Sequence, residues 1–483
     1  MSTDDAGVSR AWLALAVLAT AAVIAAPTPA GLTPRAQAAL ATGTFAAVLW
    51  VSGGLPLWLT GLLVPVLLTA LGVYPGMAES LTGFADPVLA LFLGTFALAG
   101  ALQAHGLDRR LVAGLAVAAA GLSMLISNTA TAALLVPVTV GLVDGVEAEV
   151  GPDPNLRVAA LLAVAYGASV GGVGTLVGTP PNAIAVAQLD AIGVRVTFLD
   201  WVVVGLPTAA LTLPIVWAVL VRLHPPATND VRAAAARARE LSREAGSLDA
   251  GARRVAIVFG FVAGLWLLGG VGALVADRLP PAVATTLFGG AGPSVVGPGA
   301  HQGLLYFALV GLLAVPALAL VGEFDGDDLA AIDWPTLFLF GGGLSLADAL
   351  GDTGATGWIA DGAFGALAGV PLPAVVLGVA LLTVALSELA SNTATIAVLA
   401  PVLADAGASY GGGGGVLLVM AGGLAASYGF ALPVATPPNA VAYGTGAVTR
   451  RDLLHAGLLL DVLLAVVVSG LLVAYASLGL LPG

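Results

Sequence analysis

The chain lacks cysteine and lysine and carries little charge. Without cysteine it has no disulfide, no thiolate metal site and no cysteine nucleophile. Its sixteen arginines account for the whole Lys+Arg count of 16. Only 9% of the residues are charged, against roughly 25% in a soluble domain. The formal net charge of −12 argues against nucleic acid as a partner.

Hydrophobic residues, in contrast, make up 59% of the chain and gather in long runs. Runs long enough, or nearly so, to cross a bilayer as helices lie near residues 11–30, 36–52, 55–74, 86–105, 157–190, 198–221, 254–277, 302–321, 333–351, 413–446 and 452–480. We therefore expect an all-α polytopic membrane protein with about eleven transmembrane helices.

An odd number of crossings places the two termini on opposite sides of the membrane. With the N-terminus in the cytoplasm, only Arg35, Arg195 and Arg278 of the sixteen arginines fall outside. The positive-inside rule thus predicts a plasma-membrane protein with a cytoplasmic N-terminus and an extracellular C-terminus. The first run could also be a signal peptide, but residues 1–10 lack the usual basic leader. We expect a retained helix.

Two short phrases each occur twice. Residues 127–131 read Ser-Asn-Thr-Ala-Thr, as do residues 391–395, and residues 179–183 read Thr-Pro-Pro-Asn-Ala, as do residues 436–440. Such polar and proline-rich interruptions leave backbone groups unpaired, which is costly in lipid unless a site uses them. Their order predicts two re-entrant hairpins and two broken helices, built from repeats around a central site.

The repeats divide the chain into two halves. Residues 1–221 hold a hairpin tip near 127 and a helix break near 179, and residues 254–483 hold a tip near 391 and a break near 436. Residues 222–253 form a cytoplasmic connector. The match extends to Phe92–Leu102 on Phe340–Leu350, in the fourth and ninth crossings, so the repeats should be inverted. The first half is 16 residues shorter ahead of its hairpin, which predicts a missing or reduced surface helix.

The breaks suit an anion accompanied by cations. The helix that begins at each Ser-Asn-Thr phrase has free N–H groups and a positive dipole end, which favour a carboxylate or another oxyanion. The prolines free carbonyl groups upstream, and these carbonyls, together with the Asn and Ser oxygens, suit sodium. No arginine lies near the four phrases in sequence, so cations, helix ends and hydrogen-bond donors must offset the charge of a dianion.

With these phrases, and with Leu122-Ser123 and Ser387-Glu388 ahead of the two hairpin tips, the chain resembles the divalent anion–sodium symporter family from about Gly54 to the C-terminus. The resemblance implies a homodimer in which a transport domain moves against a scaffold in an elevator-like cycle. It also implies sodium as the coupling ion and no cofactor. The substrate would be a divalent anion, with a C4-dicarboxylate such as succinate or malate expected before citrate or sulfate.

The resemblance also implies site residues. The first sodium site would use Ser123, Ser127, Asn128 and the Gly178 carbonyl. The second would use Ser387, Ala390, Asn392 and the Ala435 carbonyl. The substrate would meet Ser127, Asn128, Thr129, Thr179, Pro180, Ser391, Asn392, Thr393, Thr436 and Pro437.

Several alternatives stay open. A sodium-independent dicarboxylate exchanger would share the same phrases, and an anion channel would use the breaks as a filter. An intramembrane hydrolase would need a base beside its nucleophile, and none of the four histidines falls in the repeated phrases. Glu388, an ionisable group at membrane depth, either supports the second cation site or accepts a proton.

Overall fold

The computed structural model describes residues 9–91, 93, 94, 96, 115–227, 249–364, 369–389, 391–411 and 413–482. Regular structure in these ranges is helical, and backbone pairing typical of strands is limited there to two isolated bridges, Gly290–His301 and Ser294–Gly297. Both bridges lie between α13 (Pro281–Phe288) and α14 (Phe307–Leu320). The predicted all-α class is confirmed.

The helices follow the expected runs closely. In the first half they are α1 Arg10–Ala25, α2 Pro34–Ser52, α3 Leu57–Ala70, α4 Met77–Ser80, α6 Leu115–Ser123, α7 Asn128–Val150, α8 Pro154–Gly172, α9 Pro180–Ala191 and α10 Phe198–Leu223. In the second half they are α12 Ala250–Val275, α13 Pro281–Phe288, α14 Phe307–Leu320, α15 Gly326–Ala330, α16 Trp334–Asp352, α17 Ala355–Phe364, α18 Leu372–Leu389, α19 Asn392–Ala408, α20 Gly414–Ala425, α21 Pro437–Gly444 and α22 Arg450–Ser477.

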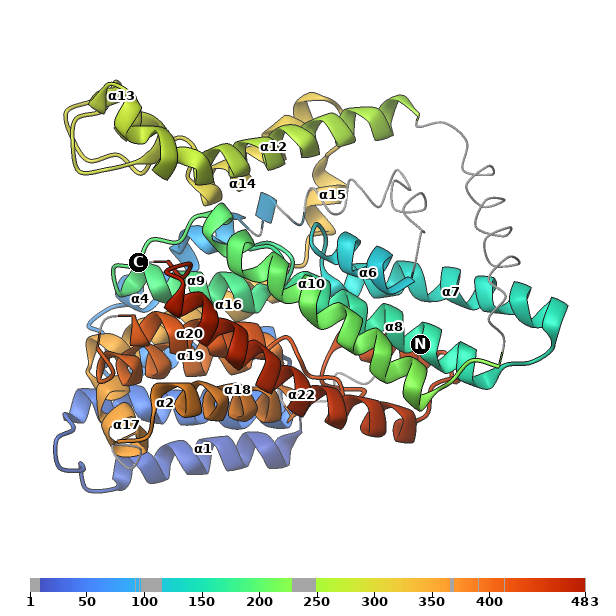
Figure 1. The fold of residues 1–483 in the computed structure, drawn as a ribbon. Coiled ribbons are helices and arrows are strands. Elements are labelled where there is room, and N and C mark those ends of the chain that lie inside the picture. The colour runs from blue at the N-terminus through green and yellow to red at the C-terminus, as the bar shows by residue number, and fades with distance from the viewer. Residues whose placement is uncertain are drawn as a thin grey trace.

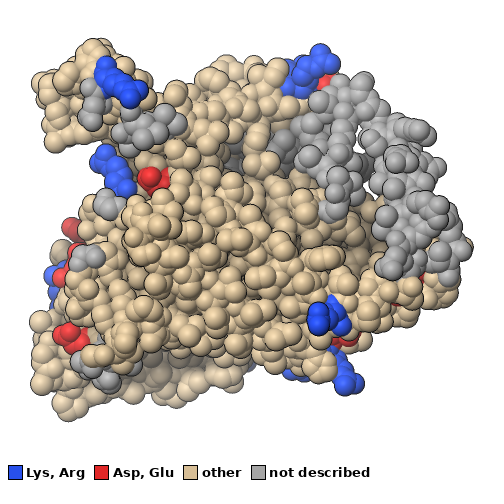
Figure 2. All heavy atoms as spheres, in the orientation of Figure 1, with Lys and Arg blue, Asp and Glu red and all other residues tan. Residues whose placement is uncertain are grey.

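Six of the described helices are long and apolar enough to cross a bilayer, namely α7, α8, α10, α12, α18 and α22. The longest, α22, has 28 residues and so extends about 42 Å, more than the roughly 30 Å of a hydrocarbon core. On the face in Figure 2 the charged side chains lie toward the two ends of the long helices, and the stretch between them is free of charge. The total of eleven crossings stays a prediction.

Both predicted helix breaks are present. The chain leaves helix at Gly172 and resumes at Pro180, and it does so again between Ala425 and Pro437. In each case a Pro-Pro pair opens the new helix, where proline is tolerated because the first N–H groups of a helix have no partner. The unwound segments, residues 173–179 and 426–436, are called loop 1 and loop 2 below.

Turns between helices lie where the two hairpin tips are predicted, but α7 and α18 are long enough to cross a bilayer, so the re-entrant character of the hairpins stays a prediction. α6 and α7 meet at Ser127, and α18 and α19 meet at Ser391. α17 precedes the second hairpin, in the stretch that the first half lacks. Some predictions lie outside the described residues: residues 92, 95 and 97–105 of the fourth crossing, residues 228–248 of the connector, and Ala390.

The two halves interlock at their broken helices. α9 packs against α19 and α20 of the second half, and α21 packs against α7 and α8 of the first. In Figure 1 the green α9 lies beside the orange α19 and α20. The second part of each broken helix therefore sits in the other half, which brings all four repeated phrases together.

A separate helix contact is made by glycines. A Cβ on Gly61 of α3 would lie 2.6 Å from the Phe338 carbonyl oxygen of α16, and one on Gly342 would lie 2.2 Å from the Gly61 carbonyl oxygen. Such close approach is typical of membrane helix packing through small residues. Tyr74 extends the contact, because its hydroxyl donates to Asp352 Oδ2 at 2.7 Å.

Candidate functional site

One open cavity of about 1310 Å³ is lined by all four repeated phrases. Every residue that the resemblance implied for substrate contact borders it: Ser127, Asn128, Thr129, Thr179, Pro180, Ser391, Asn392, Thr393, Thr436 and Pro437. Residues up to 310 positions apart in the chain thus share one wall, since 437 − 127 = 310.

Four helices begin at this cavity. α7 starts at Asn128, α9 at Pro180, α19 at Asn392 and α21 at Pro437, and all four residues line the wall. The first turn of a helix has unpaired N–H groups and carries the positive end of the helix dipole. α7 and α19 therefore offer an anion backbone donors, whereas α9 and α21 begin with Pro-Pro pairs that have no N–H and contribute only the positive potential of their dipole ends.

Among the described lining residues the one charged side chain is acidic. Asp333 precedes α16, and its carboxylate accepts hydrogen bonds from the Thr336 hydroxyl at 2.5 Å and the Thr336 N–H at 3.2 Å. Trp50 and Tyr443 also line the cavity. Sequence reasoning missed these three residues because they lie outside the repeated phrases or carry no motif of their own.

The first predicted cation site is assembled around Asn128. In the orientation that satisfies both ends of its amide, the nitrogen donates to Ser123 Oγ at 2.5 Å, to the Ala168 carbonyl at 3.1 Å and to the Gly178 carbonyl at 3.3 Å. Three oxygens thus surround one point. Ser127, the fourth predicted ligand, uses its hydroxyl to accept from the Ala130 N–H at 3.3 Å and so caps α7.

The donor atoms of this cluster are of the kind that a hard monovalent cation prefers. If the Asn128 amide turns its oxygen inward, Ser123 Oγ lies 2.5 Å from Oδ1, and Asn128, Ser123, Ala168 and Gly178 present oxygens only. Oxygen donors without a carboxylate match a group-one ion, whereas zinc prefers nitrogen and sulfur ligands. The room for it depends on glycine, because a Cβ on Gly172 would lie 2.3 Å from Asn128 Oδ1.

The second predicted cation site repeats part of this arrangement. Ser387 Oγ lies 2.6 Å from Asn392 Oδ1 and 2.6 Å from the Ala426 carbonyl oxygen. Ala435 lines the cavity at the end of loop 2. Ala390 lies outside the described residues. The Ser–Asn pair five residues apart is thus present in both hairpins.

A further matched pair holds the two loops. Asn182 Nδ2 donates to the carbonyls of Gly172 at 2.9 Å and Thr175 at 2.7 Å. Asn439 Nδ2 donates to the carbonyls of Gly429 and Leu432, both at 3.1 Å. Each amide thereby ties two carbonyls of an unwound segment in place. No role was predicted for Asn182 or Asn439, the asparagines of the two Thr-Pro-Pro-Asn phrases, although their repetition could have suggested one.

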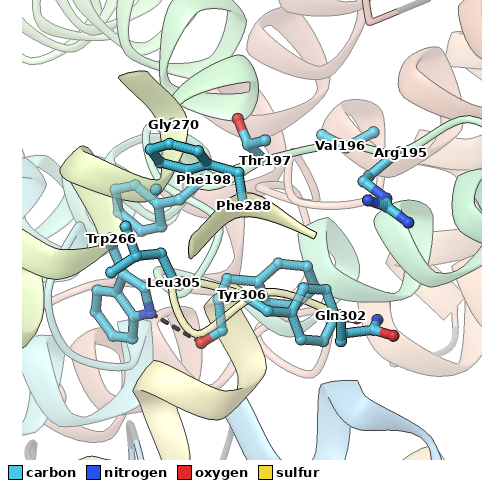
Figure 3. Close-up of a pocket in the computed structure, with 12 residues that line it drawn as sticks. Arg195, Val196, Thr197, Phe198, Trp266, Gly270, Phe288, Gln302, Leu305 and Tyr306 are labelled. Carbon is cyan, nitrogen blue, oxygen red and sulfur yellow. Dashed lines mark hydrogen bonds between the residues drawn. The ribbon is translucent and has the colours of Figure 1, made fainter. Parts of the chain in front are cut away.

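A second, smaller pocket lies away from this site, at the start of α10 (Figure 3). Its volume of about 40 Å³ holds a few water molecules at most. The rings of Phe198 and Trp266 stack at 5.2 Å, and Trp266 Nε1 donates to the Phe307 carbonyl at 2.9 Å. These contacts join α10 to α12 and α14, and we interpret the pocket as a gap in the packing between these helices.

Comparison with known proteins identifies the class of protein as a membrane transporter, not an enzyme. The family model described as the transmembrane region of sodium:sulfate symporters matches residues 8–480, so the chain belongs to that family. The resemblance seen in the sequence is confirmed, and the protein is a multi-pass membrane transporter.

Two relatives show how far the likeness extends. An uncharacterized transporter of Haemophilus influenzae is 34% identical over 456 residues, which cover 90% of this chain and 91% of the relative. A sodium-dependent dicarboxylate transporter of Staphylococcus saprophyticus is 27% identical over 473 residues, which cover 91% of this chain and 86% of the relative.

Two solved structures share the fold. The YdaH transporter of Alcanivorax borkumensis matches with a TM-score of 0.54 at 18% identity, covering 84% of this chain and 88% of that structure. MtrF of Neisseria gonorrhoeae matches with a TM-score of 0.56 at 15% identity, covering 96% of this chain and 93% of that structure. At these identities the likeness concerns the fold alone.

Proposed function

We propose that the protein is a sodium-coupled symporter of divalent anions, with C4-dicarboxylates such as succinate or malate as substrates. One observation carries the proposal: four helix N-termini and two Ser–Asn oxygen clusters meet at one cavity whose described wall has no basic side chain. The sodium-dependent dicarboxylate transporter of S. saprophyticus, similar over most of both chains, supports it.

The charges explain why the two ligands would travel together. A dianion in a cavity of low dielectric needs compensation, and helix ends supply only about half an elementary charge each. The four helix ends together supply about two positive charges, which a dianion and the Asp333 carboxylate on the same wall outweigh, so bound sodium would complete the neutralisation. Conversely, the oxygen clusters would bind sodium more tightly when the anion occupies the cavity. Coupling between the ligands then follows from electrostatics.

The proposed ligand assignments are those that the resemblance to the family implies. Sodium would bind to Ser123, Ser127, Asn128 and the Gly178 carbonyl in one site, and to Ser387, Ala390, Asn392 and the Ala435 carbonyl in the other. The substrate carboxylates would meet the side chains and N–H groups of the two Ser-Asn-Thr phrases. The Thr-Pro phrases at 179–180 and 436–437 would close the site.

The same proposal includes an elevator-type movement. The scaffold would comprise α1–α4 and α12–α17, and the transport domain would comprise α6–α10 and α18–α22, related internally by inverted repeats. Trp50 and Asp333 come from the first group and the repeated phrases from the second, so the cavity lies at their boundary. A homodimer with a cytoplasmic N-terminus and an extracellular C-terminus completes the proposal.

Uptake of labelled succinate into proteoliposomes tests this function. Accumulation that requires an inward sodium gradient, and saturates with succinate, is the expected result. Uptake that ignores sodium but requires dicarboxylate inside the vesicles would instead identify an exchanger. Competition by sulfate or citrate, measured in the same assay, determines which anion the cavity prefers, and non-saturable flux would indicate a channel.

A further inference from the structure

We propose that Glu388 and Asp461 are positioning residues that hold loop 2 in the shape needed by the second cation site; this rests on the proposed function. The two carboxyl groups come from α18 and α22, are 7% and 4% exposed, and line no part of the central cavity. Their partners are three consecutive backbone N–H groups of loop 2.

The contacts with loop 2 are direct. Glu388 Oε1 accepts from the Ala431 N–H at 2.7 Å, and Oε2 accepts from the Leu432 N–H at 2.8 Å. Asp461 Oδ1 accepts from the Phe430 N–H at 3.1 Å. Outside a helix these amides would otherwise be buried without a partner, which costs free energy comparable to a lost hydrogen bond.

The loop is also held from its other side. Tyr166 of α8 donates its hydroxyl hydrogen to the Phe430 carbonyl at 2.9 Å. Gly457 of α22 lets the loop approach closely, because a Cβ there would lie 2.3 Å from the Ala431 Cα. Asp461, one helical turn beyond Gly457, thereby reaches the Phe430 N–H. The backbone at 430–432 is fixed in three directions.

The fixed segment connects to the predicted cation ligands. The Leu432 carbonyl accepts from the Ala435 N–H at 3.2 Å and from Asn439 Nδ2 at 3.1 Å. Glu388 holds Leu432 by its N–H, and Leu432 in turn holds Ala435, whose carbonyl is the predicted ligand. Glu388 also follows Ser387 directly in the chain. One side chain thus sets the spacing between two predicted ligands.

In the first half, the backbone N–H groups of loop 1 find acceptors without a carboxylate. Met124 occupies the position of Glu388, three residues before the hairpin serine. In loop 1 the N–H groups of Val173 and Gly174 donate to carbonyls three residues earlier, at 3.3 and 2.8 Å. Thr175 Oγ1 donates to the Met124 carbonyl at 2.5 Å. The two carboxyls are therefore specific to loop 2, and a defect in them should spare loop 1.

Two measurements on full-length protein test this inference. In Glu388→Gln the amide NH₂ would face one of the two loop N–H groups. We expect backbone hydrogen exchange at residues 430–432, measured by mass spectrometry in detergent, to accelerate about tenfold, while exchange at 173–175 stays unchanged. In proteoliposomes the sodium concentration for half-maximal uptake should rise about five- to tenfold. The KM for succinate at saturating sodium should change less than twofold.

Asp348→Asn is the matched control. It removes a carboxylate of α16 that accepts from the Thr82 hydroxyl and not from loop 1 or loop 2. If Glu388→Gln does not fold, Asp461→Ala, which removes the acceptor of the Phe430 N–H and the neighbour of Glu388, should show a shift of the same kind. Wild-type exchange at 430–432 or an unchanged sodium dependence in a folded variant overturns the inference. Sodium-independent uptake by the wild-type protein refutes the proposed function and the role of the two carboxyls at a cation site. The hydrogen-exchange measurement then still decides whether these carboxyls hold loop 2.

Discussion

Asn128 and Asn392 come from different halves of the chain, and each is the first residue of a helix that begins at the same cavity. Each lies five residues after a serine whose hydroxyl contacts its amide, at 2.5 and 2.6 Å. Both side chains therefore lie between a cluster of oxygen atoms and the cavity.

Replacing either asparagine by alanine should abolish transport. Asn128→Ala and Asn392→Ala each remove an amide that faces both ligands, and we expect succinate uptake to fall more than a hundredfold. The protein should still elute as a folded species in size-exclusion chromatography. Asn155→Ala is the control, because Asn155 Nδ2 makes only an exposed contact to the Pro225 carbonyl. Near-normal uptake by either site variant would refute the assigned site.

Adding one methyl group at Gly172 should damage the first cation site. The new Cβ would lie 2.3 Å from Asn128 Oδ1, so the amide must move out of the cluster. We expect Gly172→Ala to raise the sodium concentration for half-maximal uptake at least tenfold. Gly141→Ala on α7, where nothing lies within 4 Å of the new Cβ, should behave as the wild type. Equal sodium dependence of the two variants would contradict the model of the site.

Changing Asn439 to aspartate should loosen loop 2 with almost no change of shape. Asp keeps the oxygens but loses the two N–H donors that tie the Gly429 and Leu432 carbonyls. Each lost hydrogen bond at a buried group costs about 1–3 kcal/mol. We expect a lower Tm in a thermal-shift assay and a loss of uptake. Asn182→Asp should act likewise on loop 1. An unchanged Tm in both variants would show that these asparagine hydrogen bonds do not stabilise the loops.

Neutralising Asp333 should improve anion binding. Its carboxylate is the one acidic group on the described wall, and two unit charges 4 Å apart interact by about 1 kcal/mol even in bulk water. Asparagine can keep the cap at Thr336. We expect Asp333→Asn to lower the KM for succinate about two- to fivefold at fixed sodium. Asp361→Asn, an exposed change on α17, is the charge-matched control, and a KM that rises would exclude repulsion by Asp333.

Local chemistry made much of this architecture predictable. Pro180 and Pro437 each mark the start of a new helix after a break, and Ser127 and Ser391 mark hairpin tips, because proline and small polar residues act on the backbone within a few positions. The paired phrases also predicted which residues would line a common site. All ten predicted substrate contacts border the cavity.

Other features depend on partners distant in the chain. No local pattern predicted that Asn439 would bind the carbonyls of loop 2 or that Asp333 would line the same cavity as the repeated phrases. Nor did any pattern predict that Asp461 would accept from the Phe430 N–H, 31 positions away. Such contacts arise only when helices pack, and a single sequence holds no measure of which distant residues meet.

The amino-acid sequence by itself determined a helical membrane chain with two hairpins and two breaks, since hydrophobicity, proline and free N–H groups act locally. Only the tertiary structure decided that α9 crosses to α19 and α21 crosses to α7. That exchange brings four helix ends to one cavity, because unpaired backbone groups in a membrane must be buried in protein or line a polar space.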